Sequence, residues 1–407
     1  MAKVPIDELQ PGLVLGADVC GKNGRMLLSA GTVLLPNHLR VLRIWGVSAV
    51  CLAPGGEPPA TAVPDAGGEA APSPNDVWQA LDARFVLTDR AHPAVAALYG
   101  FCLRDLARAD RCPVPAVAPP PVEAGEAEPL PPGPEALVAD DPSLASFPDI
   151  YFRLREAIDD PGASAGRIAG IIGDDPSLAA RLLRLANSPF YGLARPIDSL
   201  ARGVMRIGAG ELAQLALGVA VVDRFRDIPS CCLTMRQIWE HAVGCGALAR
   251  VLGAHVGGLS QERLFVAGLL HDLGRLVLLR RLPRTMSRAM RLAWERGEPL
   301  VAAERALLGF DHAAVGRALL AQWHLPPELA SAVGGHHLAG GADLDAAIVH
   351  VADVATVALG LGSNGSPLVP PLDGAAWERL GIEPSLLAVA LSQARRQVDD
   401  IVASLVG

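Results

Sequence analysis

The sequence predicts a mainly α-helical protein with a small β-rich domain at its N-terminus. Hydrophobic residues make up 51% of the chain but aromatic residues only 4%, a mixture that favours closely packed helices over a β-sandwich. From about residue 140 onward, apolar residues recur at helical spacing and no alternating strand pattern of any length occurs. Residues 1–52 differ because glycines separate short apolar runs, which indicates strands and turns.

Turn signals define the β-rich unit. The tripeptide Lys22-Asn23-Gly24 lies between two apolar runs, residues 17–20 and 26–28, and therefore predicts a β-hairpin. Residues 36–45 carry leucines on one helical face and predict a short helix. Residues 47–52 predict a strand that closes the unit.

Changes in composition divide the rest of the chain. Segments rich in proline, glycine and alanine without helical or strand periodicity are interpreted as linkers. The predicted order is a β-rich domain at 1–52, a Pro/Gly linker at 53–75, a helical segment at 76–112, a Pro-rich acidic linker at 113–138, a helical domain at 139–360, and a loop and helix at 361–407.

Local signals mark helix starts inside the helical domain. Asp175 followed by Pro176 predicts an N-cap with proline at the first helical position. Leu178 and Leu182 then line one face of that helix. Ser199 predicts the cap of the next helix.

Charge and cysteine usage exclude several classes of protein. The net charge is −8, and residues 53–75 and 113–134 hold six acidic residues without a basic one. No basic stripe occurs, so nucleic-acid binding is disfavoured. Seven cysteines without a C-x-x-C pair fit a reducing cytosol. We expect a soluble cytoplasmic protein, because neither a signal peptide nor an apolar run long enough to span a membrane is visible.

One set of histidines and aspartates points to a metal site. Imidazole and carboxylate donors in one centre suit Zn, Mn, Ni or Fe. These donors are spread over several predicted helices, which is what a site inside a helical bundle requires. The predicted ligands are His241, His271, Asp272, His312, His336, His337 and Asp353.

A structural interpretation of the same residues stays open. Buried imidazoles and carboxylates also bond to one another and fix helix positions without any ion. Gly268 is expected to allow close helix packing and Gly274 to end the helix that precedes it. His350 is expected to be structural, although its spacing from Asp353 would let it face the same way.

The surrounding sequence resembles a known family. The stretch LLHDLGR at 269–275 resembles the signature of the HD superfamily of metal-dependent phosphohydrolases. IIGDDPSLAARLLRLANSPFY at 171–191 and IDSLARGVMRIG at 197–208 resemble the start of HDOD domains, and ERALLGFDHAAVGRALLAQWHLP at 304–326 is similar to the segment before that family's His-His pair. Residues 1–52 look like the small N-terminal domain often found on HDOD and HD-GYP regulators.

The resemblance implies a bacterial, cytosolic signalling protein with an all-helical HD-type bundle. HDOD domains are regarded as regulatory modules, whereas the related HD-GYP proteins hydrolyse cyclic di-GMP at a centre of two or three metals. The seven predicted ligands match ligand positions of that centre. Three departures stand out: no Gly-Tyr-Pro stretch follows His337, Gln237 replaces an acidic ligand, and Arg275 replaces a lysine.

Three hypotheses about function follow. The first is a regulatory binding module with a signalling protein as partner. The second is a phosphohydrolase or cyclic-dinucleotide phosphodiesterase, in which metals activate water, Asp272 and Arg275 are the catalytic candidates, and a nucleotide second messenger is the ligand. The third is a sensor that binds a metal or ligand without chemistry.

Overall fold

The computed structural model describes two compact units, residues 1–71 and 72–407. Short segments within residues 3–52 are described for the first unit. For the second unit the described residues are 74–107, 125, 128–139, 141, 144, 149–160, 162–188, 191, 196–225, 233–337 and 343–405.

The first unit is built from two antiparallel strand pairs. Strand β1 (Lys3–Pro5) pairs with β4 (Ala49–Cys51), and β2 (Val19–Cys20) pairs with β3 (Met26–Leu28). The pairing of β2 with β3 confirms the predicted hairpin, and β4 lies inside the predicted closing strand. A small apolar core is formed by Leu9, Leu15, Val19, Val50 and Leu52. The helix predicted at 36–45 lies outside the described residues.

The second unit is helical in all its described elements. Its helices are α2 (Pro74–Arg84), α3 (Pro93–Ala107), α4 (Pro134–Ala139), α5 (Asp149–Asp159), α6 (Ala165–Gly173), α7 (Pro176–Ala186), α8 (Leu200–Ile207), α9 (Ala209–Arg224), α10 (Met235–Val256), α11 (Gln261–Leu270), α12 (Leu273–Arg281), α13 (Pro283–Arg296), α14 (Leu300–Leu308), α15 (His312–Gln322), α16 (Pro327–Gly335), α17 (Leu344–Leu359), α18 (Gly374–Leu380) and α19 (Pro384–Leu405).

Helix starts follow the local signals. The Asp175 side chain accepts hydrogen bonds from the backbone of Ser177 and Leu178, and Pro176 is the first residue of α7. Ser199 caps α8 by accepting a hydrogen bond from the backbone N–H of Arg202. Both caps satisfy backbone donors that have no partner inside the helix, and both confirm the predicted boundaries.

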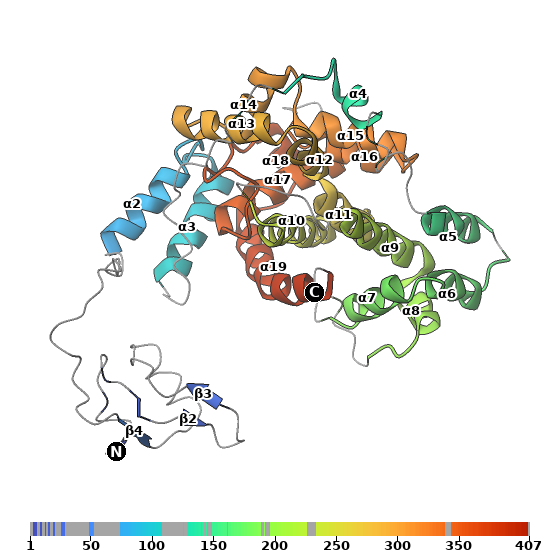
Figure 1. Ribbon diagram of the computed structural model, residues 1–407, viewed down its shortest axis with the longest axis horizontal. Coiled ribbons are helices and arrows are strands. Elements are labelled where there is room, and N and C mark those ends of the chain that lie inside the picture. Colours follow the sequence, from blue (N-terminus) through green and yellow to red (C-terminus); the bar gives the residue numbers. More distant parts are fainter. Residues whose placement is uncertain are drawn as a thin grey trace. The chain divides into compact units, whose positions relative to one another are not determined.

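Helix α10 runs through the centre of the second unit and packs against α11, α17 and α19 (Figure 1). Its crossing with α11 is unusually close because two glycines meet there. A Cβ atom at Gly268 would lie 2.7 Å from the Cα atom of Gly246, a separation that real Cβ atoms do not adopt. This crossing brings the middle of α10 against the end of α11, where His271 follows.

The helices that precede α5 also belong to the second unit. Helix α3 packs against α17 and α19, and α4 packs against α15. The end of the range predicted as a Pro-rich linker, 113–138, is therefore structured. Pro134 begins α4, a position that proline tolerates because its missing N–H has no intrahelical partner. Leu137 and Val138 are then buried, at 2% and 0% exposure.

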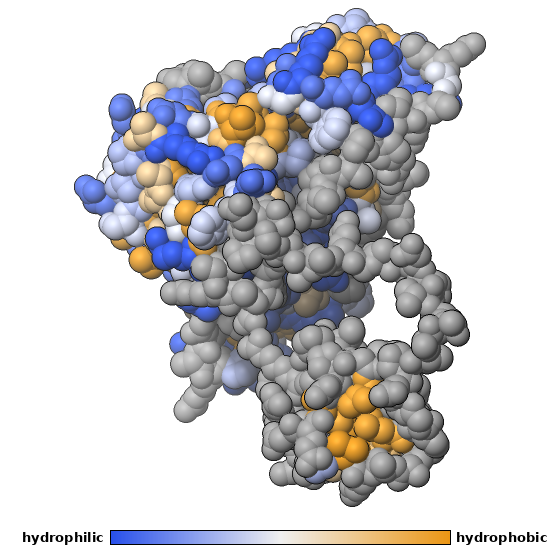
Figure 2. Space-filling model, turned by 90° about the vertical axis from the view of Figure 1, so that its left-hand side faces the viewer, coloured by the Kyte–Doolittle hydropathy of each residue, from blue (hydrophilic) through white to orange (hydrophobic). Residues whose placement is uncertain are grey.

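On one face of the second unit, apolar side chains are dispersed among polar ones (Figure 2). On the face shown in Figure 2, orange apolar residues of the second unit form small groups among blue hydrophilic ones. No single described helix has the length and apolar character needed to cross a membrane, although the bent pair formed by α8 and the adjoining part of α9 passes that test jointly.

Candidate metal centre

All seven predicted ligands converge in the interior of the second unit. They come from the second turn of α10, the junction of α11 and α12, the start of α15, the end of α16 and the middle of α17. His271, His312 and His336 are completely buried, and His337 is half-buried. Residues more than 100 positions apart in the sequence therefore share one polar pocket.

Four of these residues form the first donor set, here called the His241 group: His241, His271, Asp272 and Asp353. The Nε2 atoms of His241 and His271 lie 3.2 Å apart. Asp353 Oδ1 lies 3.1 Å from His241 Nε2 and 3.6 Å from His271 Nε2. Asp272 Oδ2 lies 3.6 Å and 3.5 Å from the same two nitrogens.

This spacing fits a divalent ion. With ligand bonds of about 2.1 Å, neighbouring ligand atoms lie roughly 3.0 Å apart around an octahedral ion and about 3.4 Å apart around a tetrahedral one. Asp353 Oδ1, which faces both imidazoles, is buried and has no hydrogen-bond partner among the described residues. An ion between these atoms would satisfy that oxygen. The residues present therefore fit a metal.

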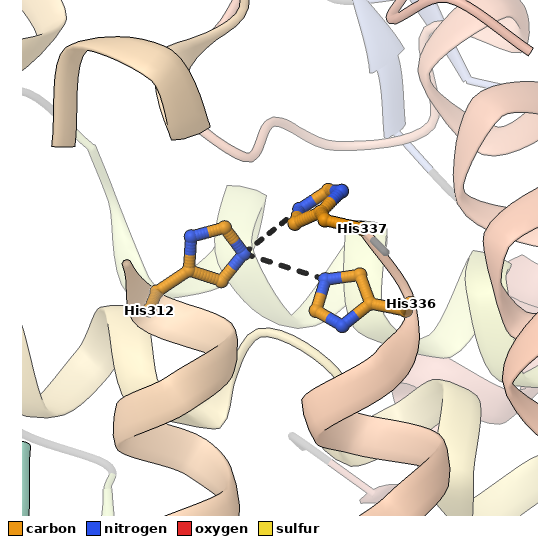
Figure 3. Close-up of side chains that lie close together, drawn as sticks. All are labelled: His312, His336 and His337. Atoms are coloured by element: carbon orange, nitrogen blue, oxygen red, sulfur yellow. Dashed lines mark hydrogen bonds between the residues drawn. The ribbon is translucent and has the colours of Figure 1, made fainter. Parts of the chain in front are cut away.

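The second donor set, here called the His312 group, contains His312, His336, His337 and the Oδ1 atom of Asp272. His312 Nε2 lies 3.4 Å from His336 Nε2 and 3.1 Å from His337 Nε2, and the three rings converge at the facing ends of α15 and α16 (Figure 3). Asp272 Oδ1 lies 3.0 Å from His312 Nε2. Asp272 thus connects the two groups through its two oxygens.

Backbone contacts orient the rings. His271 Nδ1 donates a hydrogen bond to the Gly268 carbonyl at 2.7 Å, and His336 Nδ1 donates to the Val333 carbonyl at 2.6 Å. These bonds direct both Nε2 atoms into the pocket, as second-sphere partners of metal-binding histidines usually do. His350 has another role: it bridges the His336 carbonyl and the backbone N–H of Asp373.

Two glycines set the position of the His-Asp pair. Gly268 allows the α10–α11 crossing, as predicted. Gly274 does not end a helix; it is the second residue of α12, and a Cβ atom there would lie 1.9 Å from the His312 carbonyl oxygen. The prediction for Gly274 is wrong because its lack of a side chain serves contact between α12 and α15 rather than helix termination.

Arg275 and Glu304 complete the pocket. The guanidinium donates through Nη1 to Asp272 Oδ2, and its Nε lies 3.4 Å from Glu304 Oε1. Glu304 also accepts hydrogen bonds from the backbone N–H of His312, at 3.0 Å, and from the His312 ring. Glu304 was not singled out in the sequence. An acidic residue among the buried Leu300, Ala303 and Leu308 of α14 was the available signal.

Charged neighbours control the ionisation of the metal-free carboxylates. Burial acts to raise the pKa of Asp272, but Arg275, His271 and His312 outweigh it and hold that pKa well below its usual value. Burial opposes the ionisation of Asp353 in the same way, and the close approach of the His241 and His271 rings holds its pKa well below the usual value. Both carboxylates are therefore ionised and able to act as ligands.

The histidines separate into two kinds. Burial acts to lower the pKa of His312, but Glu304 and Asp272 outweigh it and raise that pKa to about 9. Burial and the neighbouring cationic histidines lower the pKa of His336 to about 3. The pKa of His337 lies well below its usual value for the same reasons. Without metal, the site thus holds a protonated His312 and neutral His336 and His337 beside ionised carboxylates.

Gln237 lies where the resemblance places a further acidic ligand. Its backbone N–H donates to Thr234 Oγ1, and its Oε1 accepts from the backbone N–H of Thr234 at 3.0 Å. The two residues form a capping box at the start of α10. The Gln237 side chain is therefore used for helix capping.

Comparison with known proteins identifies the domain. A family model of the HDOD domain matches residues 144–339. These residues form an HDOD domain. The matched range contains every predicted ligand except Asp353, which α17 supplies from just beyond it. In the described part of this range every regular element is a helix, and the His-Asp pair lies at the α11–α12 junction.

Solved structures support this assignment. An HDOD domain protein of unknown function from Geobacter sulfurreducens is 27% identical, with a TM-score of 0.53, over 64% of this chain and 91% of that one. A candidate phosphohydrolase from Shewanella amazonensis SB2B shares the fold at 21% identity, with a TM-score of 0.51, over 65% of this chain and 99% of that one.

A curated relative matches the HDOD region as well. An uncharacterized protein of Treponema pallidum is 26% identical over 195 residues, which cover 48% of this chain and 37% of the relative. The match therefore spans little more than a third of that relative's length.

Proposed function

We propose that this chain is a bacterial signalling regulator whose HDOD domain is a binding module with a divalent metal ion in its interior. The ion would be held by the His241 group and would stabilise the folded domain, so that metal supply controls the binding-competent state. A signalling protein is the proposed partner, and the cytoplasm the proposed location.

The observation that carries this proposal is that the converged residues are buried and that the nearby cation, Arg275, is already paired. Asp272 is 7% exposed and Asp353 is 1% exposed. Arg275 is 4% exposed, and its donors are directed at Asp272 and Glu304 rather than at solvent. A hydrolytic centre needs a path for a phosphate and a cation free to bind it. This geometry favours a structural and sensory role over catalysis.

The chain's own residues would perform defined tasks at a bound ion. His241 and His271 would donate nitrogen lone pairs, while Asp272 and Asp353 would neutralise the charge of the ion. A divalent ion supplies Lewis acidity and can lower the pKa of a bound water. The backbone contacts of His271 fix the ring before an ion arrives, so little ordering is required on binding.

The alternative is a metal-dependent phosphohydrolase that acts on a nucleotide second messenger. The observation in its favour is the placement of Asp272, whose two oxygens reach both donor groups as a bridging carboxylate does in two-metal hydrolases. In that case Asp272 would hold the reacting ions and Arg275 would have to leave its present partners to bind a phosphate.

One experiment separates the two functions. Protein purified without chelator is analysed for bound Zn, Mn, Fe and Ni, and its melting temperature is measured with and without a chelator. The same sample is incubated with cyclic dinucleotides and nucleoside phosphates. We expect bound metal, a lower melting temperature after chelation, and no turnover. Turnover that disappears in Asp272→Ala would establish the enzyme instead, and a chelator-insensitive, metal-free protein would contradict both.

A further inference from the structure

We infer that the Arg275 guanidinium takes the place of a second metal ion, so that this centre binds one divalent ion, in the His241 group. The inference rests on the proposed metal binding and adds the number and place of the ions. It concerns a pocket with two donor groups, for which two ions would otherwise be expected.

Arg275 lies at the junction of the two groups. Its Nη2 atom is 3.0 Å and 3.1 Å from the two ring nitrogens of His312, and Nη1 donates to the same Asp272 carboxylate that connects the groups. Its Nε atom lies 3.4 Å from Glu304. The guanidinium therefore contacts the central ligand of the His312 group and two carboxylates at once.

The two groups differ in the negative charge that they offer an ion. The His241 group contains two carboxylates, Asp272 and Asp353, which balance a divalent ion. The His312 group contributes three imidazoles and only one shared oxygen of Asp272. The guanidinium also lies directly against the central ring of this group, with Nη2 3.0 Å and 3.1 Å from the two ring nitrogens of His312. A dication in the His312 group would lie beside a fixed positive charge in a buried, weakly screened interior.

Arg275 cannot readily move aside. It is 4% exposed and follows Gly274, whose backbone lies directly against His312. Two carboxylates, Asp272 and Glu304, accept from its planar fork of donors, and a guanidinium stays protonated under all physiological conditions. A lysine, with a flexible stem and a proton it can lose, would lack both constraints. The exclusion of a second ion is thus a property of arginine at this position.

The test is the metal stoichiometry of Arg275→Met, which removes the charge and keeps an unbranched side chain. Wild-type protein, Arg275→Met and Arg280→Met are saturated with Mn²⁺, dialysed and analysed for metal per chain. Arg280→Met is the matched control because Arg280 is an exposed arginine on the same helix. We expect about one ion in the wild type and the control, and about two in Arg275→Met.

Electron paramagnetic resonance supplies a second readout. Two Mn²⁺ ions joined by the Asp272 carboxylate would be exchange-coupled, so Arg275→Met should lose the isolated six-line signal of the wild type. Adding His337→Ala should remove the second ion and restore that signal. If Arg275→Met does not fold, Arg275→Met combined with Glu304→Gln removes both charges, and Arg275→Lys tests the importance of the guanidinium.

The outcomes are distinct. Two ions in the wild type would overturn the inference, as would one ion in a folded charge-removed variant, and both results leave the proposed metal binding intact. No ion in the wild type would overturn the proposed metal centre and this inference together.

Discussion

Individual carboxylates at this site each contact several other groups. Asp272 contacts His271 and Arg275 through one oxygen and His312 through the other, while Glu304 accepts hydrogen bonds from both the ring and the backbone of His312. Shared carboxylates make the positions of α11, α12, α14 and α15 depend on one another. Loss of one acidic group should therefore affect both the ion and the helices around it.

Replacement of Asp353 by asparagine tests the ligand role of its carboxylate. The variant keeps the shape of the side chain but removes one of two negative charges in the His241 group. We expect metal affinity to fall by roughly tenfold or more, since even partners behind the ligands contribute about that much. Titration calorimetry with Mn²⁺ or Zn²⁺ measures it. Asp400→Asn, at an exposed position of α19, is the control and should bind normally.

The sequence predicted which side chains converge better than it predicted their surroundings. The seven donors could be found because histidine and aspartate are recognisable by residue type, and all seven meet in the pocket. Glu304 could not be assigned, because its contact with His312 forms only when the folded chain brings α14 and the start of α15 together. The hydrolase hypothesis made Arg275 a catalytic candidate, but the structure places its guanidinium between the buried acids Asp272 and Glu304.

At the scale of helices, the α10–α11 crossing determines whether His241 reaches His271. Gly268→Ala would place a Cβ atom against the backbone of Gly246. We expect destabilisation of about 1–3 kcal/mol from overpacking, together with weaker metal binding because the helices separate. Denaturant unfolding measures the first effect and calorimetry the second.

A matched glycine provides the control. A Cβ atom at Gly170, inside α6, would meet nothing within 4 Å. Gly170→Ala should therefore stabilise the protein by about 0.5–1 kcal/mol through its backbone entropy. Equal effects of the two substitutions would contradict the close-crossing explanation.

A second interaction joins distant elements. Helix α13 has no side-chain cap from its own N-cap residue, and Glu128, which lies shortly before α4 in the chain, supplies one. Its carboxylate accepts hydrogen bonds from the backbone of Arg284 at 3.1 Å and of Thr285 at 2.9 Å. A cap between residues so far apart in the sequence leaves no local signal. For that reason the sequence predicts a linker over all of residues 113–138.

Glu128→Ala should lower the free energy of unfolding by about 0.5–2 kcal/mol, the usual effect of removing a helix cap. Chemical denaturation of the full chain measures the loss. Glu295→Ala, an exposed acid within α13, should be nearly neutral. If the Glu128 variant is as stable as the Glu295 variant, the cap makes no net contribution.

At the scale of the whole molecule, the HDOD domain is completed by helices outside its matched range. Helix α17 supplies Asp353, α3 packs on α17 and α19, and α4 covers part of α15. Helical periodicity and caps predicted the helices from 140 onward, since those signals are local. The docking of α3 and α4 could not be predicted, because burial of an apolar face does not specify which neighbour covers it.

The central claim is that an ion is held between α10, the α11–α12 junction and α17. Anomalous diffraction from crystals of metal-loaded protein, recorded at the absorption edge of the metal, tests it most directly. We predict one anomalous peak bonded to His241, His271, Asp272 and Asp353. A peak centred on His336 and His337 instead, or no peak in the pocket under saturating metal, would contradict the account.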